Sequence, residues 1–139
     1  KSAFKLPHPH LDTPYDYSFS GLKTAVLNTL NNAKMKGEEI NLNDLCASFQ
    51  YTVCDILTSH LFKAARDLGI KTIVAAGGVC ANSGLRALLK ERADKEGCNL
   101  YYPPISLCGD NAAMIAAAGY YKFLDGKTAD TSLNASALD

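Results

Sequence analysis

The stretch from 72 to 83, TIVAAGGVCANS, constrains the fold more than any other part of the chain. Its β-branched apolar start is typical of a strand buried on both faces. The pair Gly77 and Gly78 can take positive φ or allow another group close to the backbone. We expect Asn82 or Ser83 to cap a helix that begins directly after this turn. The order of strand, glycine turn and helix predicts an α/β protein.

This turn has the geometry of an anion site, because the free N–H groups and the positive dipole end of the following helix favour a phosphate or another anion. The stretch is neither the Gly-Lys-Ser/Thr of a Walker loop nor the Gly-x-Gly-x-x-Gly of dinucleotide binders. Strand–glycine–helix turns are common in α/β proteins. A purely structural turn is therefore the alternative interpretation.

Length and composition indicate one ordinary globular domain, with 139 residues of which 47% are hydrophobic. Fourteen basic residues balance fourteen acidic ones, so net charge gives no argument for a nucleic acid or a membrane. Five cysteines without a Cys-x-x-Cys pair argue against a disulfide framework and a structural zinc site. With neither a signal peptide nor a membrane-length apolar run, we expect a cytoplasmic protein without membrane contact.

Periodicity predicts strands at 15–20, 71–76 and 98–102 and helices at 22–36, 45–68, 85–96 and 111–124. Asn41 is the expected cap of the second helix, and a glycine follows each helix. The last helix is apolar nearly all round, so we expect it to pack tightly against neighbours. The order predicts a mainly parallel sheet with crossover helices. Residues 1–126 would form the folded lobe and 127–139 a flexible polar tail.

Ligands bind beyond the carboxyl ends of parallel strands, so the 76–83 turn and the 103–111 loop are expected to converge. Asp110, in the second loop, is the carboxylate best placed for chemistry. Its alternative role is a helix N-cap, worth about 1 kcal/mol. A lone carboxylate is a poor metal site, because a firm site needs three or four ligands. If Asp110 binds a metal, its partners lie elsewhere.

The histidines give weaker signals. His8 and His10 lie on a proline-rich start, where solvated side chains are the preferred interpretation over metal ligands. His60 lies near the apolar face of the long helix and is interpreted as a packed or hydrogen-bonded core residue. A nucleophile pair of Cys80 or Cys108 with a distant histidine is conceivable, but no spacing supports it.

Three blocks of the sequence together resemble a known family: SFSGLKT at 18–24, AGGVCAN at 76–82 followed by Leu85-Arg86, and LCGDNAAMI at 107–115. In order and spacing they are similar to consecutive motifs of the TsaD family. This family comprises the universal tRNA threonylcarbamoyladenosine transferases, long labelled O-sialoglycoprotein endopeptidases or glycoproteases. The resemblance implies an actin-like ATPase fold of two ribonuclease-H-like lobes. This chain would form most of the C-terminal lobe.

The resemblance also implies a reaction, in which threonylcarbamoyl passes from threonylcarbamoyl-adenylate to N6 of adenosine 37 in tRNA. By motif matching, Asn82 would contact ATP or the adenylate, Gly77 and Gly78 would form the floor beneath it, and Asp110 would ligate Fe²⁺ or Zn²⁺. The implied partners are tRNA, a paralogous small subunit and an ATPase in bacteria, or a kinase-like protein in archaea and eukaryotes.

The chain departs from the family pattern at Gly109, where Thr is usual, and at Ala112, where Gly is usual. The family's His-x-x-x-His metal pair and its phosphate loops belong to a preceding segment. We therefore expect the isolated chain to bind metal and nucleotide weakly or not at all and to lack transferase activity.

Other interpretations stay open. One is a nucleotide-binding or scaffold lobe without catalysis, and another is a metallopeptidase, although no His-Glu-x-x-His motif is present. A ribonuclease-H-like lobe would supply three strands before residue 40, where we predict one. An exposed sheet edge or a homodimer is therefore also expected.

Overall fold

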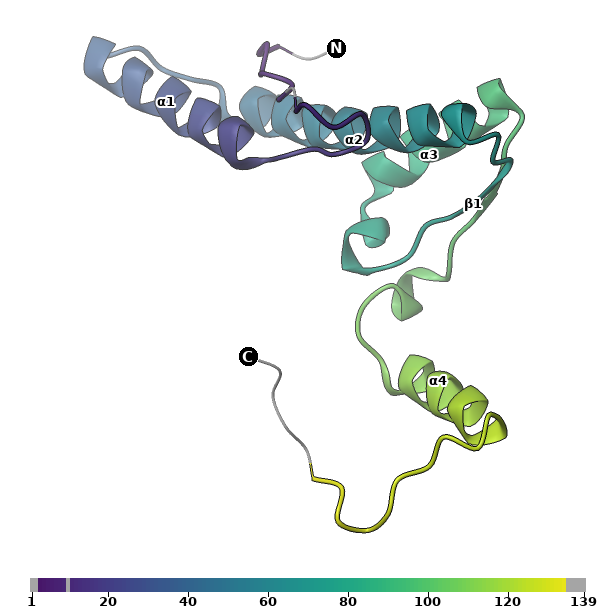
Figure 1. Ribbon diagram of the computed structural model, residues 1–139. Helices are drawn as coiled ribbons and strands as arrows, with labels where there is room; N and C mark the ends of the chain where they lie inside the picture. The colour runs from purple at the N-terminus through teal and green to yellow at the C-terminus, as the bar shows by residue number, and fades with distance from the viewer. Residues whose placement is uncertain (1–2, 10, 135–139) are drawn as a thin grey trace.

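The computed structural model describes residues 3–9 and 11–134, in which four α-helices accompany two short strands (Figure 1). The helices are α1 (Ser20–Lys36), α2 (Leu42–Asp67), α3 (Ser83–Glu96) and α4 (Ala112–Leu124); the strands are β1 (Thr72–Val74) and β2 (Asn99–Tyr101); and two 3-10 helices are η1 (Gly78–Ala81) and η2 (Ile105–Leu107).

Helix α2 is the central element of the fold. Its 26 residues begin after Asn41, whose side chain accepts hydrogen bonds from the N–H groups of Asn43 and Asp44 at 3.0 and 3.3 Å. It ends before Gly69, which has a left-handed φ of 67° that alanine would adopt only with strain. The predicted start and end of this helix are confirmed.

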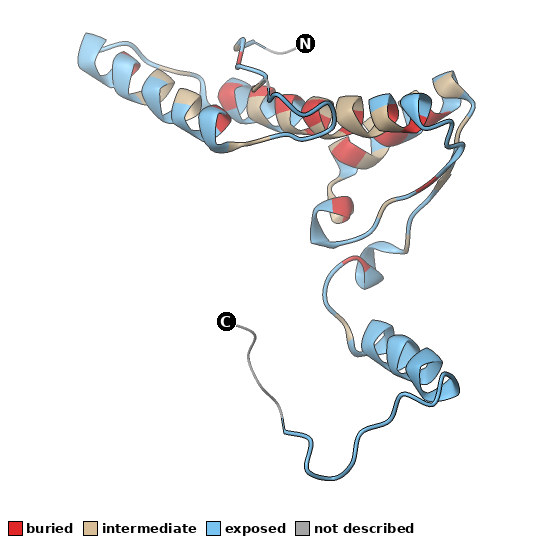
Figure 2. Cartoon of the chain, in the orientation of Figure 1, coloured by how far each residue is buried: buried red, intermediate tan, exposed pale blue. Residues whose placement is uncertain are grey.

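Two hydrophobic clusters form against α2. The larger joins Phe62 of α2 to Leu89 of α3 and Ile73 of β1, and the smaller joins Ile56 of α2 to α1 and the N-terminal segment. Each buried large side chain of this kind contributes about 1.5–3 kcal/mol relative to an exposed one. Most of the buried residues therefore lie in α1, α2 and α3 (Figure 2).

The strands β1 and β2 are parallel, with Ile73 opposite Leu100, and α3 is the crossover between them. A polar contact also holds α3 to α2, because Arg92 pairs with Asp55 and donates to Ser59 Oγ at 2.7 Å. The predicted parallel pair with a crossover helix is thus confirmed for 71–102, and the chain has a mixed α/β fold.

The strand predicted at 15–20 is wrong. This segment is irregular, and α1 begins at Ser20 and continues through Gly21. The alternating aromatic side chains instead contact one another and α2: the rings of Tyr17 and His60 lie 5.8 Å apart, and Tyr15 Oη donates to Asp67 at 3.3 Å. A strand needs a neighbouring edge for its backbone groups, and among the described residues this segment pairs with none.

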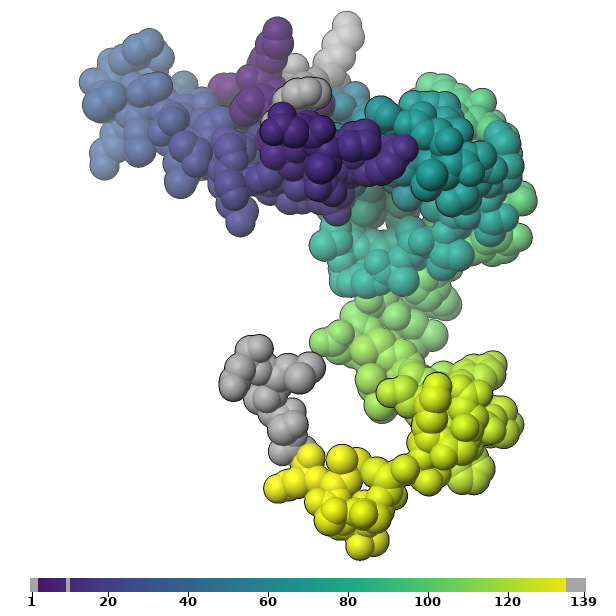
Figure 3. Space-filling model, viewed as in Figure 1, coloured from purple at the N-terminus to yellow at the C-terminus, as the bar shows by residue number. Residues whose placement is uncertain are grey.

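Burial also differs from the prediction. In β1, Ile73 is 5% exposed but Val74 is 71% exposed, because α2 and α3 cover only one face of the sheet. Helix α4, predicted to pack tightly, contains no buried residue. It stands apart from α1–α3 in the space-filling view (Figure 3). On α2, Cys54 is buried, whereas Cys46 is exposed.

No helix within the described ranges is long and apolar enough to span a membrane. The predicted flexible tail at 127–139 is described only as far as residue 134, and it stays a prediction.

Candidate functional site

The turn after β1 contains a backbone conformation that only glycine adopts readily. Gly77 has φ 93° and ψ 165°, outside the regions open to residues with a side chain. Its carbonyl accepts from Cys80 N at 2.9 Å, which closes η1 over residues 78–81. This 3-10 turn separates Gly77 from α3, which begins at Ser83 directly after the turn, so the predicted start of the helix is confirmed.

Asn82, not Ser83, caps α3. Its Oδ1 accepts from Leu85 N at 3.0 Å, and its own backbone is extended. The Asn82 amide nitrogen donates to no group in the described part of the chain. Asn82 therefore has a structural role through its oxygen, while its nitrogen remains open to a ligand.

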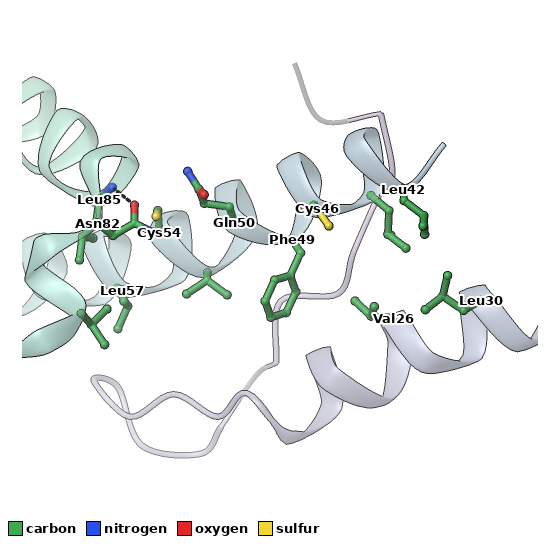
Figure 4. A pocket seen from close by; sticks show the side chains of 13 residues that line it. Val26, Leu30, Leu42, Cys46, Phe49, Gln50, Cys54, Leu57, Asn82 and Leu85 are labelled. Atoms are coloured by element: carbon green, nitrogen blue, oxygen red, sulfur yellow. Dashed lines mark hydrogen bonds between the residues drawn. The ribbon is translucent and has the colours of Figure 1, made fainter. Parts of the chain in front are cut away.

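Asn82 lines an open groove of about 380 Å³ between α1, α2 and the start of α3 (Figure 4). The groove is mainly apolar, with Gln50 and Asn82 as its polar side chains. The apolar residues that line it are Val26, Leu30, Leu42, Leu45, Phe49, Val53, Leu57, Val79 and Leu85, together with Cys46 and Cys54. Such a lining suits the flat apolar part of a ligand better than its charged part.

Arg86 joins the two loops at the carboxyl edge of the sheet. It donates from Nε to Cys80 O at 2.6 Å, and from Nη2 to Pro103 O at 2.8 Å and Cys108 Sγ at 3.0 Å. Its guanidinium also lies 4.3 Å from the ring centre of Tyr102. The 76–83 turn and the 103–111 loop therefore meet, as the parallel topology predicts.

Arg86 belongs to one of the family motifs, but its sequence context predicts no particular role. The only signal in the sequence was a charged residue four positions after the expected helix cap. Charged residues are common at this position on exposed helices, so the signal does not indicate a contact with another loop. Gly84 was also missed. A Cβ atom there would lie 2.6 Å from Nε2 of Gln50, so Gly84 leaves room for the end of this side chain of α2.

The thiols near Arg86 form no nucleophile pair with His8 or His60, the histidines that the structure describes. Burial raises the pKa of Cys80 above its ordinary value, with the Arg86 charge opposing this shift, and a raised pKa makes a thiol a poorer nucleophile. His60 Nδ1 bonds to Ile56 O at 2.8 Å, and His8 lies 3.7 Å from Asp55. The Cys–His alternative is not supported for these two histidines.

His10 lies outside the described residues. The preferred interpretation of His60 as a hydrogen-bonded residue beside the core is confirmed, because its ring is half-buried and bonded to the α2 backbone.

Asp110 is exposed, and the neighbouring Asn111 caps α4 by accepting from Met114 N at 3.0 Å. The alternative role of Asp110 as a helix cap is therefore wrong. Asp110 forms no ion pair or hydrogen bond with any other described residue. No group of three or more His, Cys, Asp or Glu side chains within residues 3–9 and 11–134 could hold a metal. The donors present do not fit a metal by themselves, and Asp110 could supply one ligand.

Replacing Asp110 by alanine should affect stability less than replacing Asn111 by alanine. Asp110→Ala removes no intramolecular contact, so we expect the free energy of unfolding to change by less than about 0.5 kcal/mol. Asn111→Ala removes the cap of α4 and should lower helix stability by about 1 kcal/mol. Urea unfolding followed by far-UV circular dichroism measures the stability of both variants. A loss of helix in Asp110→Ala equal to that in Asn111→Ala would contradict this assignment.

Taken together, these features define an α/β unit in which the loops that follow two parallel strands meet at one edge of the sheet. The family model for TsaD, tRNA N6-adenosine threonylcarbamoyltransferase, matches residues 1–117. The chain belongs to this family.

Three curated relatives, each called tRNA N6-adenosine threonylcarbamoyltransferase, show the extent of the match. The protein of Clostridioides difficile (strain 630) is 52% identical over 136 residues, covering 97% of this chain and 40% of the relative. The protein of Listeria innocua is 48% identical over 98% of this chain and 40% of the relative. The protein of Bacillus cereus (strain ATCC 14579) is 54% identical over 88% of this chain and 36% of the relative. The chain thus spans about two fifths of the length of these relatives.

Proposed function

We propose that this chain forms part of the C-terminal lobe of a tRNA N6-adenosine threonylcarbamoyltransferase with an actin-like ATPase fold. In this role it helps to bind ATP or threonylcarbamoyl-adenylate while threonylcarbamoyl passes to N6 of adenosine 37 in tRNA. The observation that carries the proposal is the junction at Arg86, which brings the two family motifs together at one sheet edge. Family membership and about 50% identity to the named transferases support it.

The proposed role of the first loop follows from its geometry. Gly77 and Gly78 carry no side chain, and a Cβ built at either meets nothing within 4 Å, so a ligand can approach the backbone there. The Asn82 amide nitrogen can donate to an oxygen of the ligand. The positive end of α3, which begins at Ser83, lies beside this turn. It favours the phosphate, whose negative charge grows as the adenylate leaves.

The second loop contributes Asp110, which we propose as one ligand of Fe²⁺ or Zn²⁺. A stable site would need further ligands from outside the described residues. For this reason we expect the isolated chain to bind the metal weakly and to show no transfer.

The exposed apolar surface supports the proposal that another polypeptide segment or chain covers part of this lobe. Ile115, Tyr121 and Phe123 of α4 are each about two thirds exposed, and Val74 of β1 is 71% exposed. A soluble protein seldom leaves so many large apolar side chains together in water. We propose that the remaining part of the enzyme, the paralogous small subunit or a second copy of the lobe covers them, and that the assembly works in the cytoplasm with its ATPase partner.

The test of the proposal is a chimera in which this chain replaces the matching segment of the Clostridioides difficile relative. We expect the chimera to transfer threonylcarbamoyl to tRNA in the presence of the relative's own partners, measured by mass spectrometry of the modified nucleoside. A folded chimera that binds ATP but transfers nothing would favour the alternative of a non-catalytic nucleotide-binding or scaffold lobe. In favour of that alternative, the described residues include no group of three or more His, Cys, Asp or Glu side chains that could hold a metal.

The Asn82→Asp variant of the chimera distinguishes the role of residue 82 as a helix cap from its proposed contact with the ligand. Aspartate keeps the N-cap of α3 but removes the amide donor and adds a negative charge beside the phosphate. We expect unchanged thermal stability and an ATP affinity lower by about tenfold or more, since a hydrogen bond to a charged group is worth about 1.5–3 kcal/mol. The matched control is Asp94→Ala on the exposed end of α3, which should bind ATP normally. Normal ATP affinity in Asn82→Asp would show that Asn82 is only a helix cap.

A further inference from the structure

Two cysteines meet at the junction of the two loops. Cys80 lies in η1 after β1, and Cys108 follows η2 after β2. They are 3% and 4% exposed, respectively, although the residue before each of them is exposed. The parallel topology therefore buries at one place two thiols that are far apart in the sequence.

Arg86 holds both cysteines in place. Its Nη2 donates to Cys108 Sγ at 3.0 Å, and its Nε donates to the Cys80 carbonyl at 2.6 Å. One guanidinium group therefore contacts both the backbone of Cys80 and the sulfur of Cys108. Cys80 Sγ also contacts Ala75 O at 3.4 Å, and Cys108 Sγ contacts Pro104 O at 3.6 Å. Each sulfur thus contacts a carbonyl of its own loop, and the side chain of Arg86 joins the two loops between them.

The remaining cysteines have no such arrangement. Cys46 is exposed on α2, Cys54 is buried in the α2–α3 cluster, and Cys98 precedes β2. No contact among the described residues joins any of these three to another cysteine. Selective oxidation of the chain should therefore act on a single pair.

We propose that Cys80 and Cys108 form a redox modification site, in which mild oxidation joins them in a disulfide between the two loops. With the thiol oxidant diamide, the two thiols give up their hydrogens and two electrons, the S–S bond forms, and the N=N bond of the oxidant is reduced to a hydrazine. In a reducing compartment the pair remains as two thiols. The bond would tie the turn after β1 to the loop after β2 and restrict their relative motion.

The test uses the 139-residue chain. Cys98 and Cys108 fall in the same tryptic peptide, so the experiment is made in a Cys98→Ser background. After diamide treatment and alkylation of the remaining thiols, we expect the loss of two hydrogen atoms. We also expect one main crosslink, between the peptides that contain Cys80 and Cys108. The melting temperature should rise, because a disulfide reduces the conformational entropy of the unfolded chain. Dithiothreitol should reverse both the crosslink and the rise in melting temperature.

Variants distinguish this pair from chance pairing. Cys108→Ser should abolish both the crosslink and the rise in melting temperature, whereas Cys46→Ser should retain both. Circular dichroism before oxidation shows whether each variant is folded. The proposal is overturned if folded chain yields mainly other pairings, or if Cys80 and Cys108 are both alkylated after diamide treatment. It is also overturned if the same crosslink forms equally well in guanidinium chloride.

Discussion

Replacing Gly77 by alanine is expected to destabilise the chain by about 1–3 kcal/mol, the usual cost of a residue held in a sparsely populated backbone region. Gly77 has φ 93° and ψ 165°, and a Cβ built there meets no atom within 4 Å. The cost therefore arises from the backbone and not from a clash. Urea unfolding followed by circular dichroism measures the change in the free energy of unfolding.

The neighbouring Gly78→Ala variant is the matched control. Gly78 has no positive φ, starts η1, and also has open space around its missing side chain. We expect its free energy of unfolding to stay within about 0.5 kcal/mol of the parent. In the chimera, however, Gly78→Ala should weaken ATP binding if the ligand lies against this backbone. Equal destabilisation by the two substitutions would contradict the backbone explanation for Gly77.

Replacing Arg86 by methionine is expected to destabilise the chain by about 2 kcal/mol. Methionine keeps much of the length and apolar contact of the side chain, but removes the donors to Cys80 O, Pro103 O and Cys108 Sγ. Hydrogen bonds from a charged donor are worth about 1.5–3 kcal/mol each, and partial exposure of Arg86 reduces their sum. Thermal and urea unfolding measure the loss, and faster hydrogen exchange is expected at residues 78–81 and 103–108.

Arg66→Met is the matched control for Arg86. Arg66 pairs with Glu96 near the surface, where its side chain is 56% exposed. Such pairs contribute at most about 1 kcal/mol, because water screens the charges. A loss in Arg66→Met as large as that in Arg86→Met would mean that Arg86 acts as an ordinary surface charge and does not join the loops.

The helices could be predicted from local signals. Apolar residues at three- and four-residue steps identified α2, and Asn41 and Gly69 marked its ends. These signals act between residues close in the sequence, so the sequence contains them in full. The alternating aromatics at 15–19 are also a local pattern, but a strand additionally requires a partner edge, which no local pattern supplies. The predicted strand therefore failed where the predicted helices succeeded.

The candidate site was predicted only in part. Topology placed Asn82 and Asp110 on loops at one sheet edge, since parallel strands end on the same side. The sequence could not decide whether Asp110 or Asn111 caps α4, because both are good caps one residue apart and only the backbone path brings Asn111 Oδ1 to Met114 N.

By itself, the sequence determined the family and the helix boundaries, because these depend on motifs and on contacts near in the chain. The order of strand, helix and strand also predicted the parallel pair, since a crossover helix joins parallel strands. The tertiary structure decided the rest: the single covered face of the sheet, the free carboxylate of Asp110, and the junction where Arg86 holds Cys80 and Cys108. These features depend on distances between residues far apart in the sequence. Such distances are set only when α2, α3 and the two strands pack together.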